Sequence, residues 1–205
     1  MPNWKIHLEV GKRLNNYLKY DDGWYNEFLL GNILPDINNC YIVKDIKKRI
    51  GHATTHFDDN ESFKHHLAFL SKYQDRLHEP IYLGYYVHLY TDYLFNHTFY
   101  NMIKKRKLDY IDKDTLRIMK QHDFKLFNNK YIDNSIKLDN IDKTLNKIDI
   151  KEVDVCKEDL ENVIKYLDNT PEYNGEYKFY TDEEMEKVLN IVVDKIIDNI
   201  KNLTK

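Results

Sequence analysis

The sequence predicts an all-α protein, and two observations carry this prediction. Apolar residues recur at the three- and four-residue spacing of one helix face along most of the chain. The 205 residues include only 6 Gly and 4 Pro, which leaves few of the turn signals that a β-sandwich or β-barrel needs. A chain of this length is expected to form one domain over residues 1–205, with a sizeable core.

The composition argues against several classes of protein. The chain has 31 basic and 34 acidic residues, a net charge of −3 and no large basic block, so no nucleic-acid patch is expected. Cys40 and Cys156 lie far apart and form no CxxC pattern, which predicts a reducing compartment and no disulfide framework. Charges interrupt the N-terminal segment where a secretory signal would be apolar, and no later run reaches transmembrane length. A cytoplasmic protein is therefore expected.

Two helices expected in the N-terminal part are amphipathic. Residues 3 to about 19 form the first, and one face of it carries Trp4, His7, Gly11, Leu14 and Leu18. Another is expected over residues 62–73, with its inward positions at Phe63, Leu67 and Leu70. The adjacent His65 and His66 point in different directions, which predicts surface or packing roles for both.

Between these two, WYNEFLLGNILPDI (residues 24–37) predicts a short helix that ends near Leu34, because the residue before a proline is pushed out of the α region. Asp36 would then lie just beyond the helix end, on a turn fixed by Pro35. The next motif, GHATTHF, carries His52 and His56 four residues apart, and only one of these needs to be functional.

One long buried helix is expected over residues 82–97, YLGYYVHLYTDYLFNH, and it carries His88 and Asp92. At about 3.6 residues per turn, their four-residue spacing places both side chains on one face. The other positions of that face are apolar: Ile81, Tyr85, Phe95 and Phe99. Gly84, one turn before His88, leaves room for another group to approach. Because a buried carboxylate is costly unless something pairs with it, the pair either binds one metal ion or bridges two, or is a hydrogen-bonded pair in the core.

The region after the central helix is less regular. Residues 104–109, KKRKLD, are expected to form a short basic connector, followed by a helix over about 114–128. Residues 129–155 are rich in Asn, Asp and Lys, which predicts loop or poorly packed helix.

Two further helices are expected near residues 157–169 and 182–203. The last begins with Thr181 and Glu184 at the spacing of a capping box. Its apolar residues form one amphipathic stripe, which predicts core packing and nothing catalytic on this helix.

Four segments in order, MPNWKIHLEVG, FLLGNILPDI, GHATTHF and LGYYVHLYTDYLF, resemble the zinc-dependent phospholipase C-like family, which is similar in fold to P1-type nucleases. The resemblance covers the first half of the chain. It implies a multi-helix bundle that holds up to three zinc ions and cleaves phosphate esters. It also implies that His7 and Asp92 contact one metal, and that Asp36, His56, His88 and Asp92 surround another. Asp92 would bridge the two ions, and Asp36 is implied as a general base.

The family's remaining zinc takes a histidine shortly after the bridging aspartate and then a His-x-x-x-Glu pair. His97 lies near the first position, and on the following helix His122 has Leu126 four residues on, with Asp123 as the nearest carboxylate. Two zinc ions are therefore expected, and a third would need His122 and Asp123; Mn²⁺ or Fe²⁺ would suit the same ligands. Tyr85, on the metal face, and His97 are the expected substrate-binding residues.

The predicted function is a metal-dependent phosphoester hydrolase, with zinc as the expected metal, in which metal-activated water attacks phosphorus. Its expected substrate is a small phosphoester or a phospholipid head group. One alternative is an HD-type phosphohydrolase that uses the adjacent His122 and Asp123. Another is a non-catalytic helical module in which the metal site is only structural.

Overall fold

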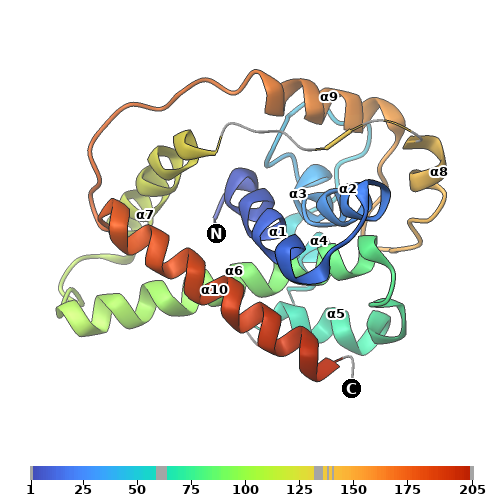
Figure 1. Cartoon of the computed structure of the whole chain (residues 1–205). Helices are drawn as coiled ribbons and strands as arrows, with labels where there is room; N and C mark the ends of the chain where they lie inside the picture. The colour runs from blue at the N-terminus through green and yellow to red at the C-terminus, as the bar shows by residue number, and fades with distance from the viewer. Residues whose placement is uncertain (1, 59–63, 132–135, 138, 140, 204–205) are drawn as a thin grey trace.

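The computed structural model describes residues 2–58, 64–131, 136–137, 139 and 141–203, and over these residues it is helical, without strands. The longest helix, α6 (Pro80–Arg106), runs through the middle of the molecule (Figure 1). The helices that pack on it include α1 (Trp4–Leu18), α2 (Asp22–Gly31), α5 (His65–Tyr73) and α10 (Asp182–Leu203). The all-α prediction is confirmed for the described residues.

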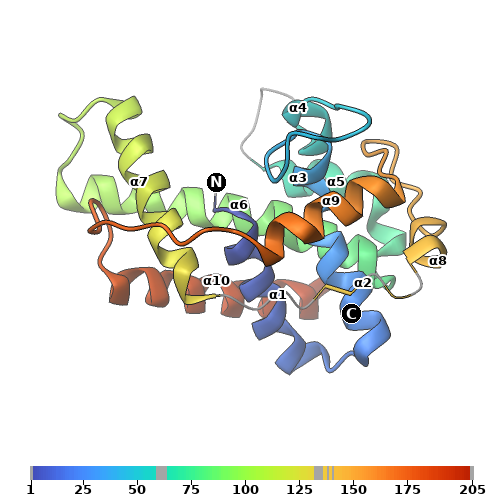
Figure 2. The same ribbon diagram turned by 90° about the horizontal axis from the view of Figure 1, so that it is seen from above.

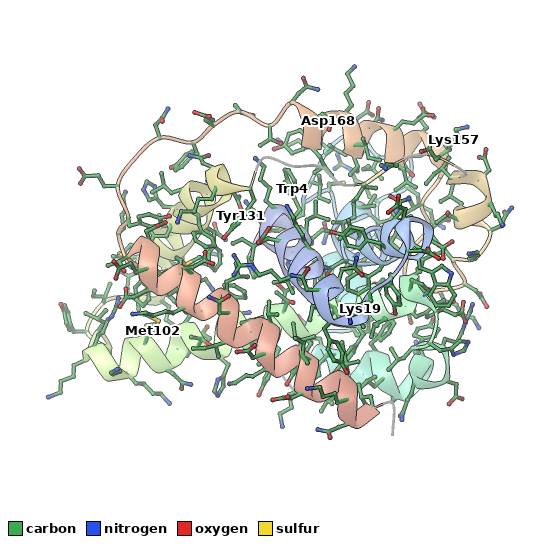
Figure 3. All side chains as sticks on the ribbon, in the orientation of Figure 1. Trp4, Lys19, Met102, Tyr131, Lys157 and Asp168 are labelled. Carbon is green, nitrogen blue, oxygen red and sulfur yellow. The ribbon has the colours of Figure 1, made fainter. Side chains whose placement is uncertain are left out.

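The remaining elements lie around this centre. The helix α7 (Lys113–Phe127) folds back beside the C-terminal part of α6, whereas α8 (Ile141–Leu145) and α9 (Lys157–Asp168) lie toward its other end (Figure 2). Side chains fill the space between the ribbons (Figure 3). The short elements are α3 (Leu34–Ile37), α4 (His52–Thr55), η1 (Gln74–Arg76) and η2 (Asn128–Lys130). No helix within the described ranges has the length and apolarity to span a bilayer.

The helix α6 is longer than the sequence predicted. Pro80 lies in its first turn, where the missing N–H costs nothing, and every side chain from Pro80 to Leu89 is buried. The helix ends at Arg106, and the next residue, Lys107, adopts the left-handed conformation (φ 56°) that is common just after a helix C-terminus. The expectation that 104–109 forms a connector is wrong for its first part, because Lys104, Lys105 and Arg106 form the last turn of α6. Basic side chains are favourable there because they face the negative end of the helix dipole.

The helices α2 and α6 cross with their backbones in contact at Gly31 and Gly84. A Cβ atom on Gly84 would lie 2.1 Å from the carbonyl oxygen of Phe28, and one on Gly31 would lie 2.1 Å from that of Ile81. The room predicted at Gly84 is therefore taken up by the backbone of α2. This crossing brings Asn32, the residue after α2, against His88.

The prediction that the second helix ends near Leu34 is wrong. The helix α2 stops at Gly31, and Pro35 lies in the first turn of the separate helix α3. Proline suits a first turn because its N–H would have no partner there. Asp36 consequently lies within α3 and is 2% exposed, whereas the sequence placed it on a turn.

The inward face of α5 also differs from the prediction. Leu67 is 49% exposed, and the buried side chains are His66 and Phe69. His66 packs among the rings of Tyr90 and Tyr93, with centroids 4.6 and 4.9 Å away, as its expected packing role requires. The expected start of this helix, residues 62–63, lies outside the described residues.

The C-terminal helices match their predictions closely. In the capping box of α10, the Thr181 N–H donates to Glu184 Oε2 (2.9 Å) and the Glu184 N–H donates to Thr181 Oγ1 (3.2 Å). The region 129–155 is mostly irregular, but buried isoleucines at 136, 141 and 150 anchor it to the core.

Candidate metal centre

The structure brings together the side chains His7, Asp36, His56, His88 and Asp92. They come from α1, from α3, from the residue after α4 and from one face of α6. Each is at most 3% exposed. Their ligand atoms form two closely spaced groups, His7–His88–Asp92 and Asp36–His56–His88, so His88 belongs to both.

His56 lies at the centre of one group. Its Nε2 atom is 3.2 Å from His88 Nε2, 3.5 Å from Asp36 Oδ1 and 3.6 Å from Asp92 Oδ2. His88 Nε2 is likewise 3.6 Å from Asp92 Oδ2. Two carboxylates and two imidazoles therefore converge on one small volume, which is a donor set suited to Zn²⁺, Mn²⁺ or Fe²⁺.

A hydrogen bond on the far side of the ring fixes the proton position of His88. Its Nδ1 lies 2.8 Å from the carbonyl oxygen of Asn32, which can only accept, so Nδ1 carries the proton and Nε2 presents a lone pair. This is how metal-binding histidines are usually oriented. On His56, the Nδ1 atom lies 3.0 Å from Thr55 Oγ1, and the Nε2 atom lies 3.2 Å from His88 Nε2.

Asp92 and His7 are the members of the cluster whose buried polar atoms have no hydrogen-bond partner among the described residues. Neither of the Asp92 carboxylate oxygens has a hydrogen-bond donor among the described residues, although both are buried. Burial raises the pKa of Asp92, an effect that the neighbouring His88 opposes. A buried carboxylate without donors is costly, so the residues present fit a bound cation.

The three histidines are held neutral. Burial lowers the pKa of His7 and His88 to about 4 and lowers that of His56 well below its ordinary value of 6.5. Neutral imidazole is the form that binds a metal ion, so protons do not compete with the metal at neutral pH.

Two predicted substrate-binding residues lie elsewhere. Tyr85 is fully buried, and its hydroxyl donates to the carbonyl oxygen of Thr55, so it holds the residue next to His56 and cannot meet a substrate. His97 is exposed on another face of α6, where its ring stacks on Tyr93 and Nδ1 bonds the Asn101 side chain (3.1 Å). Nine residues, or two and a half turns, separate His97 from His88 and turn it away from the centre.

His122 and Asp123 are not part of either ligand group. Both ring nitrogens of His122 have partners, namely the Tyr173 hydroxyl and the Glu176 carbonyl, each at 2.9 Å. Asp123 is buried and accepts backbone N–H bonds of 2.7–2.8 Å from residues 178, 179 and 180. These two residues hold the segment before α10 onto α7, and among the described residues they join no group of candidate metal ligands, so the structure lends no support to the third zinc site expected at them.

The sequence reasoning missed Asn32, Thr55 and Lys120. The first two act through backbone or hydroxyl contacts that no spacing reveals. Lys120 could have been found from the sequence, because it interrupts an apolar stripe on α7 that is formed by Leu116, Phe124 and Phe127.

A cavity of about 360 Å³ is lined among others by Trp4, Lys5, Tyr41, Phe124 and Asn128. Tyr41 links this cavity to the cluster: it is 50% exposed, yet partial burial and then the carboxylates of Asp36 and Asp92 raise its pKa. Trp4 lies at the start of α1 (Figure 3). The Oδ1 atom of Asn128 is buried without a hydrogen-bond partner among the described residues.

Comparisons with known proteins add no family assignment: no family model matches the chain, and neither a curated protein nor a solved structure matches it.

Proposed function

We propose that the protein is a metal-dependent phosphoester hydrolase similar to the zinc-dependent phospholipases C, with its centre at His7, Asp36, His56, His88 and Asp92. The observation that carries the proposal is the close approach of the His56 and His88 Nε2 atoms, 3.2 Å apart, next to a buried Asp92 carboxylate that has no hydrogen-bond donor among the described residues. A bound cation would compensate this carboxylate, and divalent cations suit phosphate ester chemistry.

The residues divide into holding and orienting roles. His56, His88 and Asp36 would hold one divalent ion, and His7 and Asp92 would hold a second. A bound divalent ion supplies Lewis-acid polarisation of a phosphoryl oxygen and lowers the pKa of water. Asp36 would accept a proton from that water, and the Asn39 side-chain amide orients it through a 3.1 Å bond to Oδ1.

The proposed substrate is a small phosphoester or a phospholipid head group. The cavity beside Tyr41 is of the size that holds such a molecule, and Trp4 and Phe124 give it apolar walls. Lys5 also lines it and is only 8% exposed, which places a cationic side chain at one wall.

A helical module with a structural metal is the second candidate. It is favoured by one observation, that all five ligand side chains are at most 3% exposed. Structural sites are closed, whereas catalytic sites keep one coordination position open to water or substrate. The HD-type alternative has no such support, because His122 and Asp123 already have structural partners.

The two candidates are separated by one experiment. The purified protein is loaded with Zn²⁺, its metal content is measured, and hydrolysis of chromogenic phosphate mono- and diesters is followed with and without a strong chelator. We expect metal binding and chelator-sensitive hydrolysis, both lost in His56→Ala and both kept in His78→Ala, a change of an exposed histidine. Full metal content without hydrolysis of any phosphoester would favour the structural module.

A further inference from the structure

Lys120 is a buried cation with little to hold it. It lies on α7, is 6% exposed, and its ammonium group donates to Asn96 Oδ1 (2.9 Å) while lying 4.5 Å from the centroid of the Phe99 ring. Within the part of the chain that the structure describes, no carboxylate forms an ion pair with it, and Asn96 supplies the side-chain acceptor. Buried lysines are rare without a paired anion, and this residue interrupts an otherwise apolar stripe.

The ammonium group lies next to the metal centre. Asn96 follows Asp92 by four residues on α6, so the two side chains are neighbours on one helix face. Lys120 and Asp92 interact electrostatically in both directions: the carboxylate opposes the lowering of the lysine pKa to about 8 by burial, and the ammonium opposes the raising of the Asp92 pKa by burial. Lys120 is therefore positively charged at neutral pH.

Metal binding neutralises the Asp92 carboxylate, the negative charge with which Lys120 interacts. The two carboxylates of the centre, Asp36 and Asp92, are neutralised by a single divalent ion, and a second ion would leave an excess of positive charge. The ammonium group then lies beside cations in a site that water barely reaches. A multiply charged anion bound between the metal and Lys120 would relieve this, and ammonium groups are common phosphate ligands.

We infer that Lys120 is a phosphoryl-binding residue, which holds a phosphate oxygen of the substrate against the metal centre. The inference rests on the proposed function and names the anion-binding group of that same site. Arg117, one turn earlier on α7 and largely exposed, interacts electrostatically with both Lys120 and Tyr41. Arg117 and Lys120 both line a cavity of about 300 Å³, so the charge of Arg117 would draw the anion into it while the buried Lys120 makes the final contact.

The test uses inorganic phosphate as the probe and binding as the readout. Phosphate affinity of the zinc-loaded protein is measured by calorimetry for the wild type, for Lys120→Met and for Lys104→Met, a control at an exposed lysine of α6. Metal content is measured on each sample. We expect Lys120→Met to keep its metal and to bind phosphate about tenfold to a hundredfold more weakly, since a charge-assisted hydrogen bond is lost. The control should bind as the wild type does.

Three results would overturn the inference, and they separate it from the proposed function. Unchanged phosphate affinity in Lys120→Met would remove the role of Lys120 alone, and loss of metal in that variant would make it a structural support of the centre. A metal-loaded wild type that binds no phosphate would count against the hydrolase as well. If Lys120→Met does not fold, amine labelling of the wild type replaces it: phosphate should slow the labelling of Lys120 relative to Lys104, and equal labelling would reject the inference.

Discussion

The imidazoles of His7 and His88 are stacked, with ring centroids 3.9 Å apart and planes 9° from parallel. Both rings direct Nε2 toward Asp92, at 3.3 Å from Oδ1 for His7 and 3.6 Å from Oδ2 for His88. Two imidazolium ions stacked at this distance would repel strongly in a buried site, so folding disfavours protonation of both rings. The candidate metal centre is therefore also an acid-sensitive point of the metal-free fold.

We predict that the metal-free protein loses stability as the pH falls from 7 to 5. The folded-state pKa of about 4 for His7 and His88 lies below the ordinary 6.5, so the unfolded chain binds more protons in this window. The penalty begins near pH 6.5 and is complete below about 4, and each histidine contributes about 2 kcal/mol at pH 5. Denaturant titrations at pH 7 and pH 5 in the presence of chelator measure it.

His66 provides the reference for this measurement. Burial lowers its pKa to about 4 as well, but it packs among tyrosines outside the centre. Bound zinc should keep the unfolding free energy of the wild type unchanged on acidification, down to the pH at which the metal dissociates. In the metal-free protein, His66→Phe should reduce the dependence of the unfolding free energy on pH, because one buried neutral histidine is removed. The raised pKa of Asp92 has the opposite effect: as the pH rises above the ordinary value of 3.8, burial of this carboxylate lowers the unfolding free energy. A metal-free protein equally stable at pH 7 and pH 5 would contradict the neutral-histidine assignment.

Replacing Asp92 by Asn tests the metal centre itself. Asn keeps the shape and removes the negative charge, so we expect metal content to fall from about two ions per chain to below one. With chelator present, Asp92→Asn should be at least as stable as the wild type, because it removes a buried carboxylate without donors. If Asp92 only bonded to a histidine, the change would instead cost about 1 kcal/mol and leave metal content unaltered. Elemental analysis and thermal melts of both proteins distinguish the two roles of Asp92, and His97→Ala, a change at an exposed histidine, is the control.

The sequence predicted the long helices and the burial of the candidate ligands on them better than it predicted the short elements between them. Helical periodicity fixes the faces of α1 and α6, so the burial of His7, His88 and Asp92 followed directly. Pro35 was misread because a proline is compatible both with the end of one helix and with the first turn of another.

Side-chain roles that depend on a distant partner could not be predicted. The residues around Tyr85 in the sequence do not predict that its hydroxyl donates to the carbonyl oxygen of Thr55, thirty residues away in the chain. Likewise, the adjacent His122 and Asp123 were predicted as a ligand pair, but the Asp123 carboxylate accepts hydrogen bonds from the backbone N–H groups of residues 178–180. Spacing shows which side chains share a face, and tertiary packing decides what that face meets.

Removing the Tyr85 hydroxyl should weaken metal binding without touching a ligand. Tyr85→Phe deletes the bond to the Thr55 carbonyl, which positions His56, and orienting partners of this kind are worth about tenfold to a hundredfold in metal affinity. Tyr86→Phe is the matched control, because its hydroxyl bonds Asn199 on α10 (2.5 Å), away from the centre. Competition with a chromogenic chelator gives both affinities. Equal zinc affinities in the two variants would show that His56 is held by other contacts.

Changing Asp123 should affect stability and leave the metal in place. Asp123→Ala leaves the N–H groups of Lys178, Phe179 and Tyr180 without their acceptor, and each buried donor left in this way costs about 1–3 kcal/mol. Metal content per folded chain should match the wild type, as it should in His122→Ala. Loss of zinc in either variant, with α-helical circular dichroism unchanged, would restore these residues to the centre.

The crossing of α2 and α6 links the stability of the fold to the geometry of the metal centre. In Gly84→Ala the new methyl group would lie 2.1 Å from the Phe28 carbonyl oxygen and 2.9 Å from the Asn32 nitrogen, and both are backbone atoms that cannot rotate away. The helices must separate, which moves the Asn32 carbonyl off His88 Nδ1. We expect a loss of about 3 kcal/mol or more in unfolding free energy, and weaker zinc binding in whatever protein remains folded.

The matched change is Gly51→Ala, because a Cβ atom at Gly51 meets nothing within 4 Å and its φ of −63° suits any residue. It should alter the unfolding free energy by less than about 0.5 kcal/mol. Urea titrations of both variants, with and without zinc, measure the two effects. The decisive comparison is the stabilisation that zinc adds: it should be smaller in Gly84→Ala than in Gly51→Ala, because the displaced carbonyl no longer fixes the His88 ring for the metal. An equal zinc increment in the two variants would show that the helix crossing supports the fold alone.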